Sequence, residues 1–561
     1  MKILLIYPYC LEDRIHTEEV SSVPIGLYYV GAFLKENHYD VEILNWHDIN
    51  KTPQKIKETL IVEKPDIIGF SILHANRWGA IEIARIAKQL DLNVKIVFGG
   101  VGATFLWKHL LTYFKEVDFV VTGEGEYTFL NLIKCFEKDR HCKTGYKNIK
   151  GIAFRKGGEV IKNKSADKIQ NLDELPIPAK YFTYQHVALT RGCPGNCTFC
   201  GSPRLWGQKV RFHSADYFIK QIELLYEKGV TFFYFSDDTF TFKKDLVIEI
   251  CKKILEKDLK IVWAAISRVN YISEELLYWM RKAGCIQISY GVESGSEKIR
   301  DLLNKNIKTD QIKRAFALTT KYGVLARAYF IYGCPGENWD TIQETIDLIH
   351  EIKPLGAIFY ILDIFPGTAL YSDFKKKAGQ TDNVWLKRVE DILYFETDPA
   401  LSTELILAFG KKLRTDFHEN LSGFADEFEL VDDKELYKMH SDFCSRLAMT
   451  FDYGDYSGIE AVKDKEGVAE RLYQKSLSYY PDHRAYLGLG IINQKKGLYE
   501  KSINIFSDGI ENFPDSEQLH ICLGISYMNA GKYNEAISYF QKFKGSEQAR
   551  YYMQSCYNAL G

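Results

Sequence analysis

Residues 191–200 read Arg191-Gly192-Cys193-Pro194-Gly195-Asn196-Cys197-Thr198-Phe199-Cys200 and hold three cysteines within eight positions. The Gly and Pro residues among them permit a tight loop. Thiolates that converge from one loop suit zinc or an iron–sulfur cluster, whereas a disulfide would leave one of the three thiols over. Zinc sites generally need a fourth ligand, so the triad favours a cubane cluster with one open iron. Zinc, or a purely structural loop, is the alternative.

The chain around this loop alternates strands with helices. We expect strands over residues 187–190, 232–236, 261–266, 287–290, 326–332 and 357–364, separated by helices such as 215–228 and 342–352. Six such units are typical of a partial (β/α)6 barrel, whose chemistry lies at the carboxyl ends of the strands. The cysteine loop directly follows the first of these strands, where that rule would place a site.

The amino-terminal region predicts a doubly wound α/β domain. Short apolar strands over 3–7, 41–45, 66–71, 94–98 and 119–122 alternate with helical segments such as 24–37 and 78–90. This pattern is typical of a parallel sheet covered on both faces, and ligands of such sheets bind beyond the carboxyl ends of the strands. Polar residues and glycines cluster at those ends, where glycines let the backbone approach a bulky ligand. They are Ser71, Gly99, Gly100, Gly102, Gly123, Glu124, Gly125 and Glu126.

Past residue 400 the chain becomes helical and then repetitive. Leu489, Gly490, Gly497, Tyr499 and Phe506 each have an identical residue 34 positions later, which is the tetratricopeptide period. We therefore predict an all-α carboxyl-terminal region after the two α/β regions. The expected boundaries are a doubly wound domain at 1–145, a connector with a hairpin near Gly157-Gly158 at 146–183, the barrel at 184–400, a helical extension at 401–460 and tetratricopeptide-like repeats at 461–561.

Composition excludes several classes of protein. The 561 residues carry 72 Lys and Arg against 74 Asp and Glu, a formal net charge of −2, which argues against a dedicated nucleic-acid binder. No apolar run reaches the roughly 18 residues that a membrane span needs. The amino terminus lacks a small-residue cleavage site and predicts a strand, so we expect a cytoplasmic protein.

The motifs resemble the radical S-adenosylmethionine (SAM) superfamily, and within it the cobalamin-dependent branch. The C-x3-C-x2-C spacing, with Phe199 in the usual aromatic position, carries the superfamily resemblance. The preceding domain looks like a cobalamin-binding domain through Val23-Pro24-Ile25-Gly26-Leu27, Gly99-Gly100 and residues 123–126. Further stretches similar to branch motifs are Phe235-Ser236-Asp237-Asp238-Thr239-Phe240, Gly291-Val292-Glu293-Ser294 and Phe365-Pro366-Gly367-Thr368.

This resemblance implies three cofactors, a [4Fe–4S] cluster, SAM and cobalamin. The cluster ligands would be Cys193, Cys197 and Cys200. The residues implied to contact SAM are Phe199, Ser236, Asp237, Asp238, Arg268, Glu293 and Tyr332. Those implied to contact cobalamin are Pro24, Ser71, Gly99, Gly100, Gly102, Gly123, Glu124, Gly125 and Glu126. Asp238 could instead cap a helix, Arg268 and Glu293 could pair with each other, and no residue is assigned as a catalytic acid or base.

One motif of the best-known cobalamin domains is absent. Their Asp-x-His-x-x-Gly loop, whose imidazole ligates cobalt, has no match after the first strand. His16 and His74 are the nearest candidates for such a ligand. The absence resembles the radical branch, where cobalamin binds without a His ligand, and a domain that has lost cobalamin is the alternative.

The implied function is methylation of an unactivated carbon, or less commonly of phosphorus, through methylcobalamin and a 5′-deoxyadenosyl radical. A radical cyclase, ring-contraction or carbon–carbon coupling enzyme without net methylation is one alternative, and a repeat-based binding or scaffold protein is another. The expected partners are a small-molecule or peptide substrate and a reductant of flavodoxin or ferredoxin type. The repeats offer a groove for a peptide or carrier protein, or they only buttress the barrel or mediate dimerisation.

Overall fold

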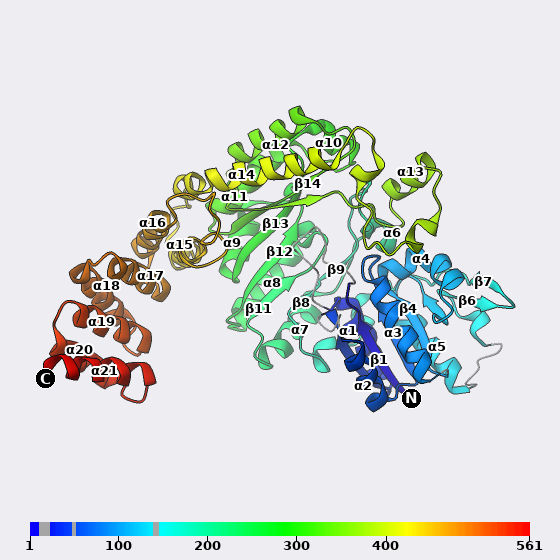
Figure 1. The fold of residues 1–561 in the computed structure, drawn as a ribbon, viewed down its shortest axis with the longest axis horizontal. Helices are drawn as coiled ribbons and strands as arrows, with labels where there is room; N and C mark the ends of the chain where they lie inside the picture. The colour runs from blue at the N-terminus through cyan, green and yellow to red at the C-terminus, as the bar shows by residue number, and fades with distance from the viewer. Residues whose placement is uncertain (11–22, 48–51, 92, 139–144) are drawn as a thin grey trace.

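The computed structural model describes residues 1–10, 23–47, 52–91, 93–138 and 145–561. It consists of a first sheet, a second sheet and a helical arm that carries the carboxyl terminus far from the amino terminus (Figure 1). The predicted succession of two α/β regions and an all-α region is confirmed.

The first sheet has seven strands in the order β2-β1-β3-β4-β5-β6-β7. Alternate residues of its strands enter different cores, Leu4 and Ile6 on one face and Ile3 and Leu5 on the other, which explains the unbroken apolar runs. The parallel strands are β1 (Lys2–Tyr7), β2 (Asp40–Asn45), β3 (Ile67–Ser71), β4 (Lys95–Gly99) and β5 (Phe119–Val121). The helices between and after them are α1 (Ile25–Glu36), α2 (Pro53–Glu63), α3 (Arg77–Leu90), α4 (Gly100–Tyr113) and α5 (Glu126–Lys138).

The predicted hairpin extends this sheet. β6 (Ile152–Lys156) pairs antiparallel with β5 and with β7 (Glu159–Lys162), and the turn between β6 and β7 is Gly157-Gly158. Short 3-10 turns at η2 (Gly145–Asn148), η3 (Leu172–Glu174) and η4 (Pro178–Lys180) flank the hairpin and lead toward the second sheet.

The second sheet is an open, parallel partial barrel of six strands in the order β15-β14-β13-β12-β11-β8. The strands are β8 (His186–Val187), β11 (Phe232–Phe235), β12 (Val262–Ser267), β13 (Cys285–Glu293), β14 (Leu325–Tyr332) and β15 (Gly356–Ile361). The helices that follow its strands are α7 (Ala215–Glu227), α8 (Lys244–Glu256), α9 (Glu274–Lys282), α10 (Glu297–Leu302), α11 (Thr309–Lys321) and α12 (Trp339–Ile352).

The first barrel strand is shorter than predicted. After β8 ends at Val187, the chain leaves the sheet and forms β9 (Thr190–Arg191), which pairs with β10 (Arg211–Phe212). The Asp237 carboxylate accepts hydrogen bonds from the backbone N–H groups of Leu189 and Thr190, at 3.2 and 2.6 Å. A side chain therefore satisfies donors that a longer strand would have used in the sheet.

The helical arm begins after α13 (Ala369–Lys377), η7 (Asp382–Leu386) and η8 (Tyr394–Thr397). In its repeats a Cβ on Gly490 would lie 2.3 Å from the Phe506 ring, and one on Gly524 would lie 2.5 Å from the Phe540 ring. The 34-residue repeat thus reflects one helix-packing contact made twice. The helices of the arm are α14 (Thr403–Glu427), α15 (Tyr437–Asp452), α16 (Lys465–Tyr479), α17 (His483–Lys495), α18 (Tyr499–Asn512), α19 (Glu517–Asn529), α20 (Tyr533–Lys542) and α21 (Glu547–Leu560), with η9 (Lys434–Leu436) before α15.

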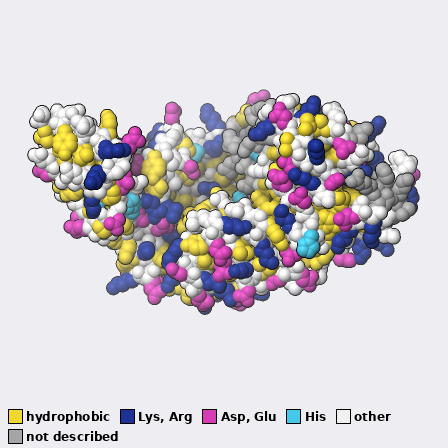
Figure 2. Space-filling view, turned by 90° about the horizontal axis from the view of Figure 1, so that it is seen from below, with side chains coloured by type: hydrophobic (Ala, Val, Ile, Leu, Met, Phe, Trp, Pro, Cys, Tyr) yellow, Lys and Arg dark blue, Asp and Glu magenta, His cyan; other side chains and the backbone are white. Residues whose placement is uncertain are grey.

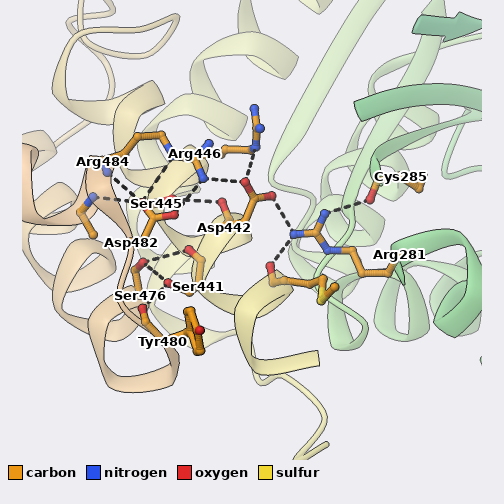
Figure 3. Close-up of polar contacts among 12 residues, drawn as sticks. Arg281, Cys285, Ser441, Asp442, Ser445, Arg446, Ser476, Tyr480, Asp482 and Arg484 are labelled. Atoms are coloured by element: carbon orange, nitrogen blue, oxygen red, sulfur yellow. Dashed lines mark hydrogen bonds and ion pairs between the residues drawn. The ribbon is translucent and has the colours of Figure 1, made fainter. Parts of the chain in front are cut away.

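A polar cluster joins the arm to the barrel (Figure 3). Asp442 of α15 accepts hydrogen bonds from Arg281 of α9 at 2.9 Å, from Arg446 at 2.9 Å and from Arg484 at 2.6 Å. On the face seen in Figure 2, basic and acidic side chains intermingle. Among the described residues, no helix combines the length and the apolar composition required to cross a membrane.

Candidate active site

The three motif cysteines lie in one loop between β9 and α6 (Ser202–Trp206). Cys193 and Cys197 are 9% and 8% exposed, Cys200 is half-buried, and none of the three is in a disulfide. Backbone hydrogen bonds fix the loop, with Thr198 N–H donating to Leu303 at 2.9 Å. Three thiols on a rigid, sheltered loop form a donor set for iron.

The loop's surroundings control the charge of these thiols. Burial raises the pKa of the Cys193 thiol and raises that of Cys200 to about 12. The Arg268 guanidinium lies 3.9 Å from the sulfur of Cys197. A metal bound to these thiols would displace their protons, and the fixed positive charge beside them favours thiolates.

Three consecutive polar side chains at the end of β11 have different hydrogen-bond partners. Asp237 is buried and binds the Leu189–Thr190 backbone, and burial raises its pKa to about 7. Asp238 accepts a hydrogen bond from the Ser202 hydroxyl, two residues beyond the cysteine loop. Ser236 bonds to His186 at 2.9 Å. Asp238 does not cap the short 3-10 turn η5 (Phe240–Phe242), which begins after Thr239.

Arg268 and Glu293 do not pair with each other. Glu293 forms a buried ion pair with Lys305, and Arg268 donates to the backbone carbonyl of Lys305. Glu293 has a left-handed φ of 68°, a conformation that is costly for a residue with a side chain and that clusters at functional sites. Lys305 was missed by the sequence reasoning, since a lone lysine between Asn304 and Asn306 gives no motif.

The cavity between the two halves

A cavity of about 310 Å³ opens between the carboxyl ends of the first sheet and the barrel. Its walls from the first sheet include Pro24, Ser71, Gly99, Gly100, Gly123, Glu124, Gly125 and Glu126, and those from the barrel include Thr190, Arg191, Trp206, His213, Ser236 and Asp238. Most of the strand-end residues selected from the sequence therefore meet in one space. Gly102 lies behind the wall, where a Cβ would approach the Leu73 backbone to 2.5 Å and push α4 away.

Two carboxylates in the cavity wall form ion pairs with arginines of the barrel region. Glu124 accepts from Arg191 at 2.7 Å and from Arg211 at 2.9 Å, and Glu126 accepts from Arg191. The Arg191 guanidinium also lies over the rings of Tyr29 and Trp206, at 5.1 and 5.3 Å. Sequence reasoning missed both arginines, although Arg191 is only two residues before Cys193.

Three predicted residues lie elsewhere. Phe199 packs into the core beneath the cysteine loop. The Tyr332 side chain leaves the barrel interior for α14, where its hydroxyl accepts from Arg414 at 3.2 Å. His74 is buried against Asp363 and Asp391 and is absent from the cavity wall, whereas His16 lies outside the described residues.

Comparison with known proteins agrees with this architecture. Residues 187–349 match the radical SAM superfamily, residues 15–133 match a B12 binding domain and residues 523–546 match a tetratricopeptide repeat. An uncharacterized methyltransferase of Pyrococcus horikoshii is 33% identical over 383 residues, covering 66% of this chain and 82% of that protein. An anaerobic magnesium-protoporphyrin IX monomethyl ester cyclase of Cereibacter sphaeroides is 28% identical over 63% of this chain and 60% of its own length.

A solved structure shares the fold. It is the radical SAM methyltransferase TsrM from Kitasatospora setae with cobalamin and a [4Fe–4S] cluster bound, and it covers 85% of this chain and 100% of that chain with 14% identity and a TM-score of 0.61.

The fold and the cysteine loop define a radical SAM enzyme. The chain belongs to the cobalamin-dependent branch of this superfamily, as its motifs predicted. The three thiols, two of them buried and one half-buried, and the glycine-lined cavity fit the cofactors of that branch, a [4Fe–4S] cluster, SAM and cobalamin.

Proposed function

We propose that this protein is a methyltransferase that methylates an unactivated carbon, with phosphorus as the less common acceptor. The observation that carries the proposal is the single cavity walled by strand ends of the first sheet and by Ser236 and Asp238 of the barrel, beside the cysteine loop. Cofactors held in the two halves would face each other across that space. Methyltransferase names among the relatives and neighbours support the same reaction.

The residues of the barrel have different roles in binding the cluster and SAM. When bound, the cluster and SAM supply a 5′-deoxyadenosyl radical and cobalamin supplies a methyl group. Cys193, Cys197 and Cys200 would hold the cluster. The segment of Ser236, Asp237 and Asp238 would contact the methionine end of SAM, and Arg268 and Glu293 would contact the same cofactor. Phe199 would hold the cysteine loop against the apolar core. The Tyr332 backbone lies at the carboxyl end of its barrel strand, as do the other strand-end residues assigned to SAM.

The first sheet would hold cobalamin mainly through close contact with its backbone. Gly99, Gly100, Gly123 and Gly125 bring backbone to the cavity surface, with Pro24 and Ser71 at its rim, and Gly102 lets α4 pack closely. Glu124 and Glu126 act through Arg191 and fix the distance between the two halves. Apolar lining from Val30, Val97 and Phe129 excludes water that would divert a radical.

Anaerobic reconstitution with iron, sulfide and cobalamin tests the proposal. We expect about four irons and one cobalt per chain, and transfer of label from methyl-labelled SAM to product when candidate substrates are supplied with a reductant. Cys200→Ala should lose iron and keep cobalt. Gly125→Leu, whose side chain would enter the cavity, should lower cobalt retention at least tenfold and keep iron, whereas Gly423→Leu at an exposed position of α14 is the matched control.

A radical cyclisation is the second candidate, because a curated relative is a cyclase. It predicts substrate-dependent 5′-deoxyadenosine without methyl incorporation. That result would replace the methyltransferase proposal and leave the cofactor assignments in place.

We further infer a cytoplasmic setting with a flavodoxin- or ferredoxin-type reductant. We assign residues 1–145 to cobalamin binding, 146–183 to a connector, 184–400 to the barrel, 401–460 to a helical extension and 461–561 to repeats that dock a peptide substrate or carrier protein. Truncation after residue 460 tests the docking role, because unchanged substrate affinity in a stable truncated protein would contradict it.

A further inference from the structure

A second cluster of metal-binding side chains lies outside the cavity, where the first sheet meets the barrel. His74 follows β3, Asp363 follows β15, and Asp391 lies between η7 and η8. Their side chains are 8%, 7% and 13% exposed, respectively. Three segments that are distant in sequence therefore bring one imidazole and two carboxylates into a nearly closed space.

The geometry places two acceptors around one nitrogen. Nε2 of His74 lies 3.1 Å from Oδ2 of Asp363 and 3.1 Å from Oδ1 of Asp391. One N–H bond can point well at only one of them. Nitrogen and oxygen ligands about 2.1 Å from a metal lie about 3.0 to 3.4 Å apart at angles between about 90° and 109°. Both nitrogen–oxygen distances match such a ligand set, and all three ligand atoms lie within 4.8 Å of one another.

The imidazole of His74 is surrounded by the two carboxylates of Asp363 and Asp391 and by one guanidinium, that of Arg77. The buried guanidinium of Arg77 donates to backbone carbonyls, those of His74 at 2.8 Å and Trp385 at 3.3 Å among them. The formal charges of two carboxylates and one guanidinium leave a net negative charge around the imidazole, which favours a bound cation.

We propose that His74, Asp363 and Asp391 bind one divalent transition-metal ion of the zinc or manganese class, with water completing its coordination. Mixed nitrogen and oxygen ligands suit these ions. The rings of Phe365 and Trp385 contact the imidazole at 4.9 and 5.6 Å and hold it in place. The ion ties the β3–α3 loop to the chain after β15 and stabilises the junction of the two halves.

The test uses the protein loaded with cluster and cobalamin, so that Cys193, Cys197 and Cys200 cannot take the added metal. It is equilibrated separately with zinc chloride and manganese chloride, desalted and analysed for all metals. We expect about one zinc or manganese per chain and a higher Tm with the metal. His74→Gln and Asp391→Asn should weaken metal binding at least tenfold with iron and cobalt unchanged, whereas Asp373→Asn, an exposed carboxylate on α13, should have no effect.

Less than one-tenth equivalent of either metal in the wild-type protein would overturn the proposal, as would equal binding by Asp391→Asn. His74, Asp363 and Asp391 would then share a proton and bind no metal ion. Asp391 is the most exposed of the three ligands, so its variant is available if His74→Gln does not fold. Metal content does not depend on methyl transfer, so this result is independent of the proposed function.

Discussion

The arginine–carboxylate junctions that the barrel forms with the first sheet and with the helical arm differ in what surrounds them. At the first sheet, Arg191 joins Glu124 and Glu126 in the wall of a cavity, with side chains 3% to 8% exposed. At the helical arm, Asp442 receives three arginines far from any cysteine ligand, with 23% of its side chain exposed (Figure 3). The first junction helps to form the wall of a cavity, whereas the second joins the arm to the barrel away from that cavity.

The largest expected effect is at the first junction. Arg191→Met leaves Glu126 buried without its cationic partner, and breaking a buried pair in this way costs about 3–5 kcal/mol. We expect a lower Tm together with loss of both cobalamin and cluster retention. Thermal unfolding and metal analysis of the reconstituted protein measure these effects. Cofactor retention at wild-type levels would show that the junction is not needed to form the cavity.

The second junction should separate stability from cofactor binding. Asp442→Asn removes the charge that Arg281, Arg446 and Arg484 share, at a cost of about 2–4 kcal/mol, less than for a fully buried pair. We expect faster proteolysis of the arm with iron and cobalt contents unchanged. If Asp442→Asn also lost cobalamin, the two junctions would not differ in their effect on cofactor binding.

The same carboxylate gives a pH dependence. Its three arginines hold the pKa of Asp442 well below the ordinary value of about 3.9, despite burial. Its stabilising contribution is therefore complete above pH of about 4 and is lost as pH falls through the lower folded-state pKa. Acid unfolding of wild type and Asp442→Asn should converge as pH falls, and a constant difference in stability between them would contradict this assignment.

Adding a single methyl group between packed helices of the arm should lower the stability of the protein. Gly490→Ala places a methyl group against the Phe506 ring, and such overpacking costs about 1–3 kcal/mol. Thermal unfolding should show this loss of stability, whereas Gly423→Ala at an exposed position of α14 should cause no overpacking.

The smallest effect is expected where an ion pair is exposed. Asp426 and Arg471 pair at 2.8 Å with side chains 40% and 47% exposed. Asp426→Asn should cost less than about 1 kcal/mol. A shift in Tm as large as that of Asp442→Asn would mean that exposure does not separate the two ion pairs.

What the sequence predicted follows from how locally each feature is encoded. The alternation of apolar strands with helical segments predicted the two α/β regions, the 34-residue repeat predicted the arm, and the strand-end glycines predicted most of the cavity wall. Lys305 and Arg211 act on partners 12 and 87 residues away, so no short pattern reveals them. The break after β8 depends on the distant Asp237 carboxylate, which also hides it from a reading of strand periodicity.

A cavity with walls from two folding units has a consequence for protein engineering. Exchanging the amino-terminal half for that of a relative would replace Glu124 and Glu126 while Arg191 and Arg211 stay behind. A working chimera therefore has to carry the carboxylates and the arginines as one set, with the crossover point chosen by that pairing and not by the chain boundary between the sheets.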